Sequence, residues 1–101
     1  MVKKIYFNNL KENQSYTDSI KVTDASIKKF SSASGDRNPI HLNEKFAKNT
    51  IFKSRIAHGM LIASFISSVI GNKFPGNGTI YVSQDLKFKK PVKINDVEKI
   101  K

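Results

Sequence analysis

The chain has 101 residues, enough for one small domain, so we expect residues 1–101 to form a single domain. It contains no cysteine, which excludes disulfides, thiolate metal sites and a cysteine nucleophile. The net charge of +10 has two interpretations. One is a polyanionic partner, such as a nucleic acid or a phosphate-rich cofactor. The other is the lysine-, asparagine- and isoleucine-rich composition that an AT-rich coding sequence produces.

Nothing in the sequence indicates a membrane protein. The most apolar stretch, residues 60–70, is shorter than the roughly 20 residues that a membrane-spanning helix needs. The first residues, Met1 to Lys4, are not followed by the long apolar run of a signal peptide. We therefore expect a cytoplasmic location without membrane contact, which the lack of cysteine fits.

The first half of the chain predicts one strand and two short helices. Loose alternation over residues 16–22 predicts a strand. Thr23 then supplies an N-cap signal for a helix that ends near residues 34–35. Residues 35–39 form a loop by composition, because Gly, Asp, Asn and Pro all favour turns. Residues 41–49 predict a second short helix.

The second half predicts the main helix and two strands. Residues 59–70 are apolar nearly all round, which is typical of a buried helix, and Gly71 is a suitable C-cap. Residues 79–89 alternate, with a slip that indicates a bulge, and predict a strand that Pro91 ends. Residues 92–100 begin another strand. One buried helix followed by strands indicates an α+β domain.

The most informative stretch places Asp36 and His41 five residues apart across a turn that contains Asn38. A carboxylate beside an imidazole can share one water molecule, so that one group removes a proton and the other donates one. Two histidines in the whole chain make a poor zinc site, and we expect no metal. The structural alternative is that Asp36 makes an Asx-turn and that His41 only begins a helix.

The same stretch resembles the signature of the MaoC-like dehydratase family, as Ser34-Gly35-Asp36-x-Asn38-Pro39-Ile40-His41. Two further blocks also look like this family and follow in the right order: Ala57-His58-Gly59-Met60-Leu61, and Pro75-Gly76-x-Gly78-Thr79-Ile80-Tyr81 with Phe88-x-x-Pro91-Val92 and Asn95-Asp96-Val97. The resemblance runs from about Tyr16 to the last residue.

The resemblance implies a hot-dog fold, in which an antiparallel β-sheet wraps around a central helix, and a homodimer. It also implies an R-specific enoyl-CoA hydratase, which adds water reversibly to trans-2-enoyl-CoA and gives R-3-hydroxyacyl-CoA. No cofactor is implied, because coenzyme A is part of the substrate.

The resemblance also implies roles for particular residues. Asp36 and His41 are the expected dyad that holds and activates the water. Asn38 is expected to brace the loop, and Ser67 to lie near Asp36 and help to orient it. Gly59 is expected to offer its backbone N–H to the thioester oxygen. That role fits a helix start, where free N–H groups meet developing negative charge, although simple helix-start geometry would also explain the glycine.

Other polar residues near these blocks have plainer interpretations. We interpret His58 as a hydrogen-bonded packing group beside a buried helix, and not as an acid or base. The lysines at 87, 89 and 90 could meet the phosphates of coenzyme A, or they could be the solvated face of a strand.

The chain departs from the family pattern at its end. It stops at Lys101, where family members continue, so we expect a sheet without its C-terminal strands and with an unpaired edge. A truncated gene, a fragment, and a half completed by another chain remain open. Two other functions also remain: a dehydratase acting on acyl carrier protein thioesters, and an inactive thioester-binding or dimerisation remnant. No nucleic-acid-binding motif accompanies the charge, so we expect no nucleic acid partner.

Overall fold

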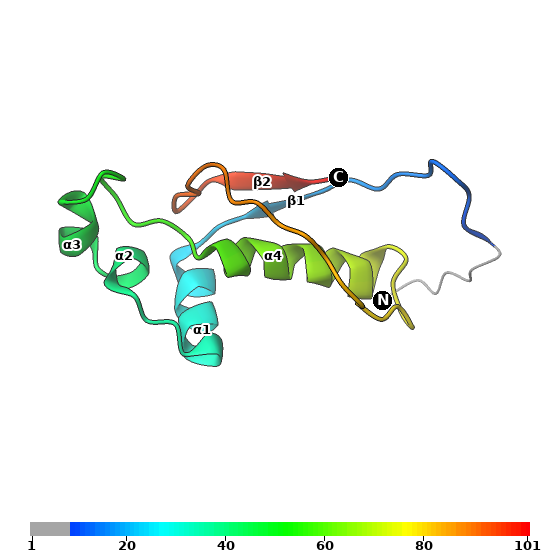
Figure 1. Cartoon of the computed structure of the whole chain (residues 1–101), viewed down its shortest axis with the longest axis horizontal. Helices are drawn as coiled ribbons and strands as arrows, with labels where there is room; N and C mark the ends of the chain where they lie inside the picture. The colour runs from blue at the N-terminus through cyan, green and yellow to red at the C-terminus, as the bar shows by residue number, and fades with distance from the viewer. Residues whose placement is uncertain (1–8) are drawn as a thin grey trace.

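The computed structural model describes residues 9–101 (Figure 1). The first eight residues of the expected domain, including the segment considered as a signal peptide, lie outside the described residues. The elements follow the order β1 (Asp18–Lys21), α1 (Asp24–Ser34), α2 (Pro39–Leu42), α3 (Glu44–Lys48), α4 (Gly59–Ser68), the π-helix η2 (Val69–Lys73) and β2 (Val97–Ile100). No helix within residues 9–101 is long and apolar enough to cross a membrane.

The sheet consists of β1 and β2, which pair antiparallel with Asp18 opposite Ile100 and Lys21 opposite Val97. Both strands alternate between half-buried and exposed residues, as expected for a sheet with one covered face. The covered face lies along α4 (Figure 1). The predicted strands at residues 16–22 and 92–100 are thus confirmed over shorter ranges.

Helix α1 has clear physical boundaries. The Thr23 side chain accepts a hydrogen bond from the Ser26 N–H at 3.0 Å, and the Ser26 hydroxyl accepts one from the Thr23 N–H at 3.0 Å. This reciprocal capping satisfies two N–H groups that the helix leaves free. The helix ends at Gly35, whose φ of 81° favours glycine. The predicted start and end are therefore confirmed.

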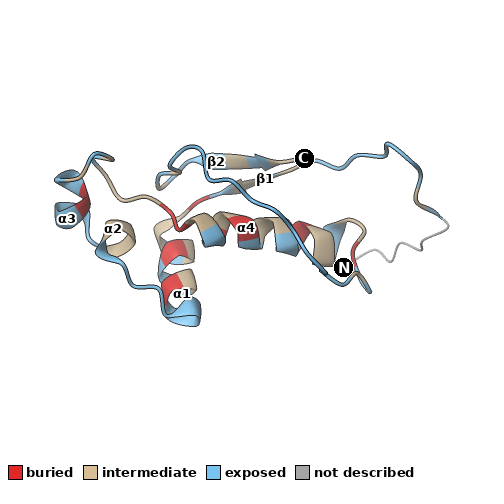
Figure 2. Ribbon diagram, in the orientation of Figure 1, coloured by how far each residue is buried: buried red, intermediate tan, exposed pale blue. Residues whose placement is uncertain are grey.

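The core is small and lies where α1, the start of α4 and the chain after Pro91 meet (Figure 2). Val22, Ile27, Ala57 and Leu61 are its buried members. The radius of gyration is 15.9 Å, whereas a compact chain of this length has about 13 Å. The fold is therefore open, and much apolar surface stays exposed.

The prediction of a strand over residues 79–89 is wrong. This segment crosses α4 in an extended form (Figure 1), but its backbone makes no hydrogen bond to another part of residues 9–101 apart from the Thr79 N–H to Gly76. Ile80 and Val82 are 81% and 91% exposed. Alternation predicts a half-buried surface, but a strand also needs a pairing partner, and the described chain provides none there.

The prediction of one helix over residues 41–49 is also wrong, because Asn43 divides it. The Asn43 N–H donates to the Pro39 carbonyl at 2.8 Å and ends α2. Its side chain then accepts from the Phe46 N–H at 3.0 Å and begins α3. Helix α2 starts at Pro39, since proline at the first helical position loses no intrahelical bond.

The main helix differs from its prediction in two ways. It is not capped at Gly71, because the chain continues as η2, whose last hydrogen bond joins the Phe74 N–H to the Val69 carbonyl at 2.8 Å. It is also not buried all round, since Met60 is 57% exposed. The two-stranded sheet covers only one side of α4.

The Thr23 cap gives a test of this local structure. Thr23→Ala removes the acceptor for the Ser26 N–H and should lower the free energy of unfolding by about 1 kcal/mol. Thr23→Ser keeps the hydroxyl and should stay close to wild type. Urea unfolding followed by circular dichroism compares the three proteins, and equal midpoints for the alanine and serine variants would contradict the assignment.

Candidate active site

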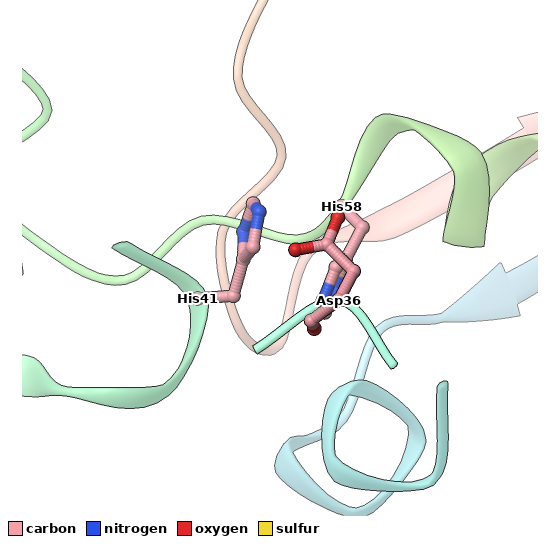
Figure 3. A group of neighbouring side chains, drawn as sticks. All are labelled: Asp36, His41 and His58. Carbon is pink, nitrogen blue, oxygen red and sulfur yellow. Dashed lines mark hydrogen bonds between the residues drawn. The ribbon is translucent and has the colours of Figure 1, made fainter. Parts of the chain in front are cut away.

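The side chains of Asp36, His41 and His58 lie close together (Figure 3). They come from the loop after α1, from α2, and from the residue before α4. One carboxylate oxygen and one nitrogen of each imidazole lie within 4.8 Å of one another. A tetrahedral water with two hydrogen bonds of about 2.8 Å joins atoms about 4.6 Å apart. The Asp36 and His41 atoms thus lie within the reach of one shared water molecule.

The loop that carries Asp36 is held by local hydrogen bonds. The Asp36 N–H donates to the Ser34 hydroxyl at 3.1 Å, and the Asn38 N–H donates to Oδ1 of Asp36 at 3.3 Å. Asn38 in turn caps α2 by accepting from the Ile40 N–H at 3.2 Å. Asp36 thus makes the Asx-type contact of the structural alternative. Its Oδ2 makes no hydrogen bond to another described residue, so one oxygen stays available.

The ring of His41 has a defined orientation. Its Nδ1 lies 2.8 Å from the carbonyl oxygen of Ile56. A carbonyl oxygen can only accept, so Nδ1 carries the proton and donates it. In the neutral ring, Nε2 then has a free lone pair. His41 can therefore act as a base through Nε2 without losing the hydrogen bond that holds it.

Arg55 holds the backbone of His41. Its Nε–H donates to the His41 carbonyl at 2.7 Å, and its terminal nitrogen pairs with Asp24 at 2.7 Å. The nearby cations, first Lys28 and then Arg55, lower the pKa of Asp24. Sequence analysis missed this residue. The available signal was that Arg55 is one of only two arginines in a lysine-rich chain, since guanidinium suits such forked contacts better than lysine.

His58 is buried, with 2% of its surface exposed. Its Nε2 lies 3.0 Å from the Asp36 carbonyl oxygen and 3.0 Å from the Ser31 hydroxyl. Its ring stacks on that of His41, with centroids 3.9 Å apart and planes 26° apart. Burial is the main cause that lowers the pKa of His58, and the hydrogen bond to the Asp36 carbonyl opposes it. His58 is therefore neutral near pH 7.

The stacked rings bear on whether Asp36, His41 and His58 could hold a metal ion. An imidazole donates to a metal in its ring plane, with a Zn–N distance of about 2.0–2.1 Å. Rings that stack face to face at 3.9 Å direct their lone pairs along nearly parallel planes and not toward one point. The arrangement suits acid–base chemistry better than metal binding.

A cavity of about 450 Å³ opens beside His41, and Asp36 is not among the residues that line it. His41 and Gly59 both line it, together with Phe52, Ile56, Ala57, Ile62, Lys87, Phe88, Lys89, Lys90, Pro91, Val92 and Glu98. The Gly59 N–H, at the start of α4, donates to no acceptor within residues 9–101. A Cβ at Gly59 would lie 2.9 Å from the Phe88 ring. The lack of a side chain at Gly59 thus lets the Phe88 ring lie close to the Gly59 backbone.

Ser67 is not among the residues that line the cavity of His41 and Gly59, and its expected role beside Asp36 stays a prediction. It is exposed on α4 and lines a second cavity of about 410 Å³ with Phe30, Met60 and Tyr81, among others. It makes no hydrogen bond to Asp36 within the described residues. At a rise of about 1.5 Å per residue, Ser67 is about 12 Å along the helix from Gly59.

Residues 7–101 match the model of the MaoC like domain family, and the chain belongs to this family. It is 52% identical over 91 residues to an (R)-specific enoyl-CoA hydratase of Rhodospirillum rubrum, covering 90% of this chain and 63% of that protein. It is 41% identical over 97 residues to a 3-hydroxybutyryl-CoA dehydratase of Methylorubrum extorquens, covering 96% and 62%.

Among solved structures, an unliganded R-hydratase of Pseudomonas aeruginosa superimposes with a TM-score of 0.92 at 42% identity, covering 97% of this chain and 63% of that one. The expected hot-dog fold is therefore confirmed. The chain spans about three fifths of the length of these relatives.

The lowered pKa of His58 predicts how stability depends on pH. Below the ordinary histidine pKa of about 6.5, the unfolded chain binds a proton that the folded protein resists, so the His58 contribution to stability is lost as the pH falls. Charged His41 would oppose this protonation, and Asp36 would favour it.

We expect the free energy of unfolding to fall from pH 7 to pH 5, and to fall less steeply in His58→Gln, which has no group to protonate. Urea titrations at each pH measure both slopes. Parallel curves for the two proteins would contradict a neutral buried His58.

Proposed function

We propose that this chain carries the active site of an R-specific enoyl-CoA hydratase, a hydro-lyase of fatty acid metabolism. The observation that supports this best is the proximity of the Asp36 carboxylate to the His41 ring, whose Nε2 is unprotonated in the neutral form, beside a cavity that His41 and Gly59 line. These groups are what the addition of water to a conjugated thioester requires: a base, an acid, and a donor for the carbonyl oxygen.

The proposed reaction begins with a water between Asp36 and His41. One of the two groups takes a proton from the water as its oxygen bonds to C3 of the enoyl thioester. The C2–C3 π electrons move toward the carbonyl, whose oxygen gains negative charge. The proton that the base took from the water then goes to C2, which completes the net addition of water and returns both groups of the dyad to their starting state. General acid–base catalysis by one such group typically raises the rate by about 100- to 10,000-fold.

Gly59 is the proposed donor to the thioester oxygen. Its N–H donates to no acceptor within residues 9–101 and lies at the positive end of α4, and Gly59 lines the same cavity as His41. A preorganised donor stabilises the developing oxyanion more than the neutral carbonyl, so it lowers the barrier.

The carrier of the acyl group is proposed to be coenzyme A. Lys87, Lys89 and Lys90 line the same cavity as His41 and Gly59, and the whole chain has a net charge of +10. Positive charge at a cavity attracts an anionic substrate, and lysine binds phosphate as a point charge. Acyl carrier protein is also anionic, so assays with both carriers distinguish the related dehydratase.

We further propose that the protein works as a cytoplasmic homodimer without a cofactor. Ile80, Val82 and Phe88 are more than half exposed. Apolar side chains gathered on one exposed segment are typical of an association surface. Light scattering of the purified protein measures its mass, and a monomer with full activity would contradict the dimer.

The proposed function is tested with trans-2-butenoyl-CoA, by following the loss of the conjugated thioester absorbance. Wild type should form the R-3-hydroxy product. Asp36→Asn and His41→Gln should each lower kcat by about 100-fold or more, because each removes one proton-transfer group. A folded wild type without turnover would refute the enzyme and leave a binding or dimerisation remnant. Faster turnover with the acyl carrier protein thioester than with the coenzyme A thioester would show that acyl carrier protein is the carrier.

The role of Gly59 has a matched pair of variants. Gly59→Ala and Gly59→Pro both add a Cβ against Phe88, but only proline lacks the N–H. Proline is suited to the first helical position, and the extended His58 before it, with φ −60° and ψ 135°, tolerates a following proline.

The proline variant should have a kcat about 100- to 1,000-fold lower than that of the alanine variant. Circular dichroism checks that both are folded. Equal rates in the two variants would show that the Gly59 N–H does not act on the thioester.

A further inference from the structure

His58 does not line the cavity, yet it contacts both members of the dyad. Its ring stacks on His41, and its Nε2 is 3.0 Å from the backbone oxygen of Asp36. It also directly precedes Gly59 in the chain. The His58 side chain therefore lies beside the segments that carry the His41 ring, the Asp36 carboxylate and the Gly59 N–H.

The hydrogen bonds of His58 define where its proton lies. The Asp36 carbonyl oxygen can only accept, so Nε2 carries the proton. The Ser31 hydroxyl, also 3.0 Å away, shares this donor. Nδ1 is then a bare acceptor, and it is buried without a partner in the described structure. Packing alone would not require an imidazole with one unpaired nitrogen, since buried polar atoms are nearly always satisfied.

We propose that His58 is a positioning residue for the dyad, which holds the Asp36 loop through Nε2–H and supports the face of the His41 ring. This inference rests on the proposed hydratase function. The bond from His41 Nδ1 to Ile56 lies in the plane of the ring and leaves the ring free to rock about that bond. The stacked face of His58 stops this rocking. His58 alone thus fixes the position of the Asp36 loop relative to the His41 ring.

The proposal predicts a loss in kcat rather than in substrate binding. His58→Ala removes both contacts and should lower kcat about 100-fold, the effect of displacing a reacting group by about 1 Å. KM should stay within about threefold, because the cavity walls are unchanged.

His58→Gln keeps a donor near the Nε2 position, and His58→Phe keeps a flat ring. Each should recover part of the lost rate. If the alanine variant does not fold, the glutamine and phenylalanine variants are compared with wild type, and each should lose part of kcat.

Ile27→Val is the matched control. Ile27 is fully buried in the same core but contacts neither dyad residue through a hydrogen bond or a ring. It should lower stability and leave kcat unchanged. Three results would overturn the proposal: unchanged kcat in the His58 variants, a loss confined to KM, or the same loss of kcat in Ile27→Val.

A readout independent of turnover separates this inference from the proposed function. Nitrogen-15 spectra of histidine-labelled wild type should show His58 neutral at pH 7 with its proton on Nε2. A proton on Nδ1 would overturn the inference whatever the activity. No turnover by wild type with the proton on Nε2 would instead refute the hydratase function, because the contact would be present without the chemistry.

Discussion

The hydrogen bond between Nδ1 of His41 and the carbonyl of Ile56 is the contact on which the site depends. It leaves Nε2 as the free nitrogen of the neutral ring. The connector that carries Ile56 is itself held on two sides. The Ile56 N–H donates to the Ile40 carbonyl at 3.3 Å, and the Ala57 N–H donates to the Val92 carbonyl at 2.7 Å. Three segments far apart in sequence thereby meet at one imidazole.

Around this contact, short local elements place the other groups. Helix α1 ends at Gly35, and the loop that carries Asp36 follows. Arg55 ties the His41 carbonyl to Asp24 at the start of α1. The start of α4 then supplies the Gly59 N–H. Gly35 and Gly59 both lie at helix ends, where backbone groups are free to bind a side chain or a substrate.

Features that depend only on residues close together in the sequence could be predicted from the sequence. The Thr23 cap, the helix end near Gly35 and the loop after it were predicted because caps and turn-favouring residues act on their immediate neighbours. The proximity of the Asp36 and His41 side chains was predicted because a five-residue turn brings its ends together, and their joint role stays a prediction.

What the sequence did not reveal depends on contacts between distant segments. The stacking of His58 on His41 joins residues 17 positions apart, and no local pattern encodes it. The forked contacts of Arg55 reach 31 positions back to Asp24. The error at residues 79–89 has a related cause, because alternation records which faces are apolar but not whether a strand lies beside them.

The central claim is that this geometry holds a water and a thioester together. A crystal structure of Asp36→Asn with trans-2-butenoyl-CoA tests it most directly. We expect the thioester oxygen within hydrogen-bond distance of the Gly59 N–H, and C3 next to a water that contacts Nε2 of His41. An acyl group bound in the second cavity beside Met60 and Ser67, with Nε2 of His41 facing no ligand or water, would contradict the account.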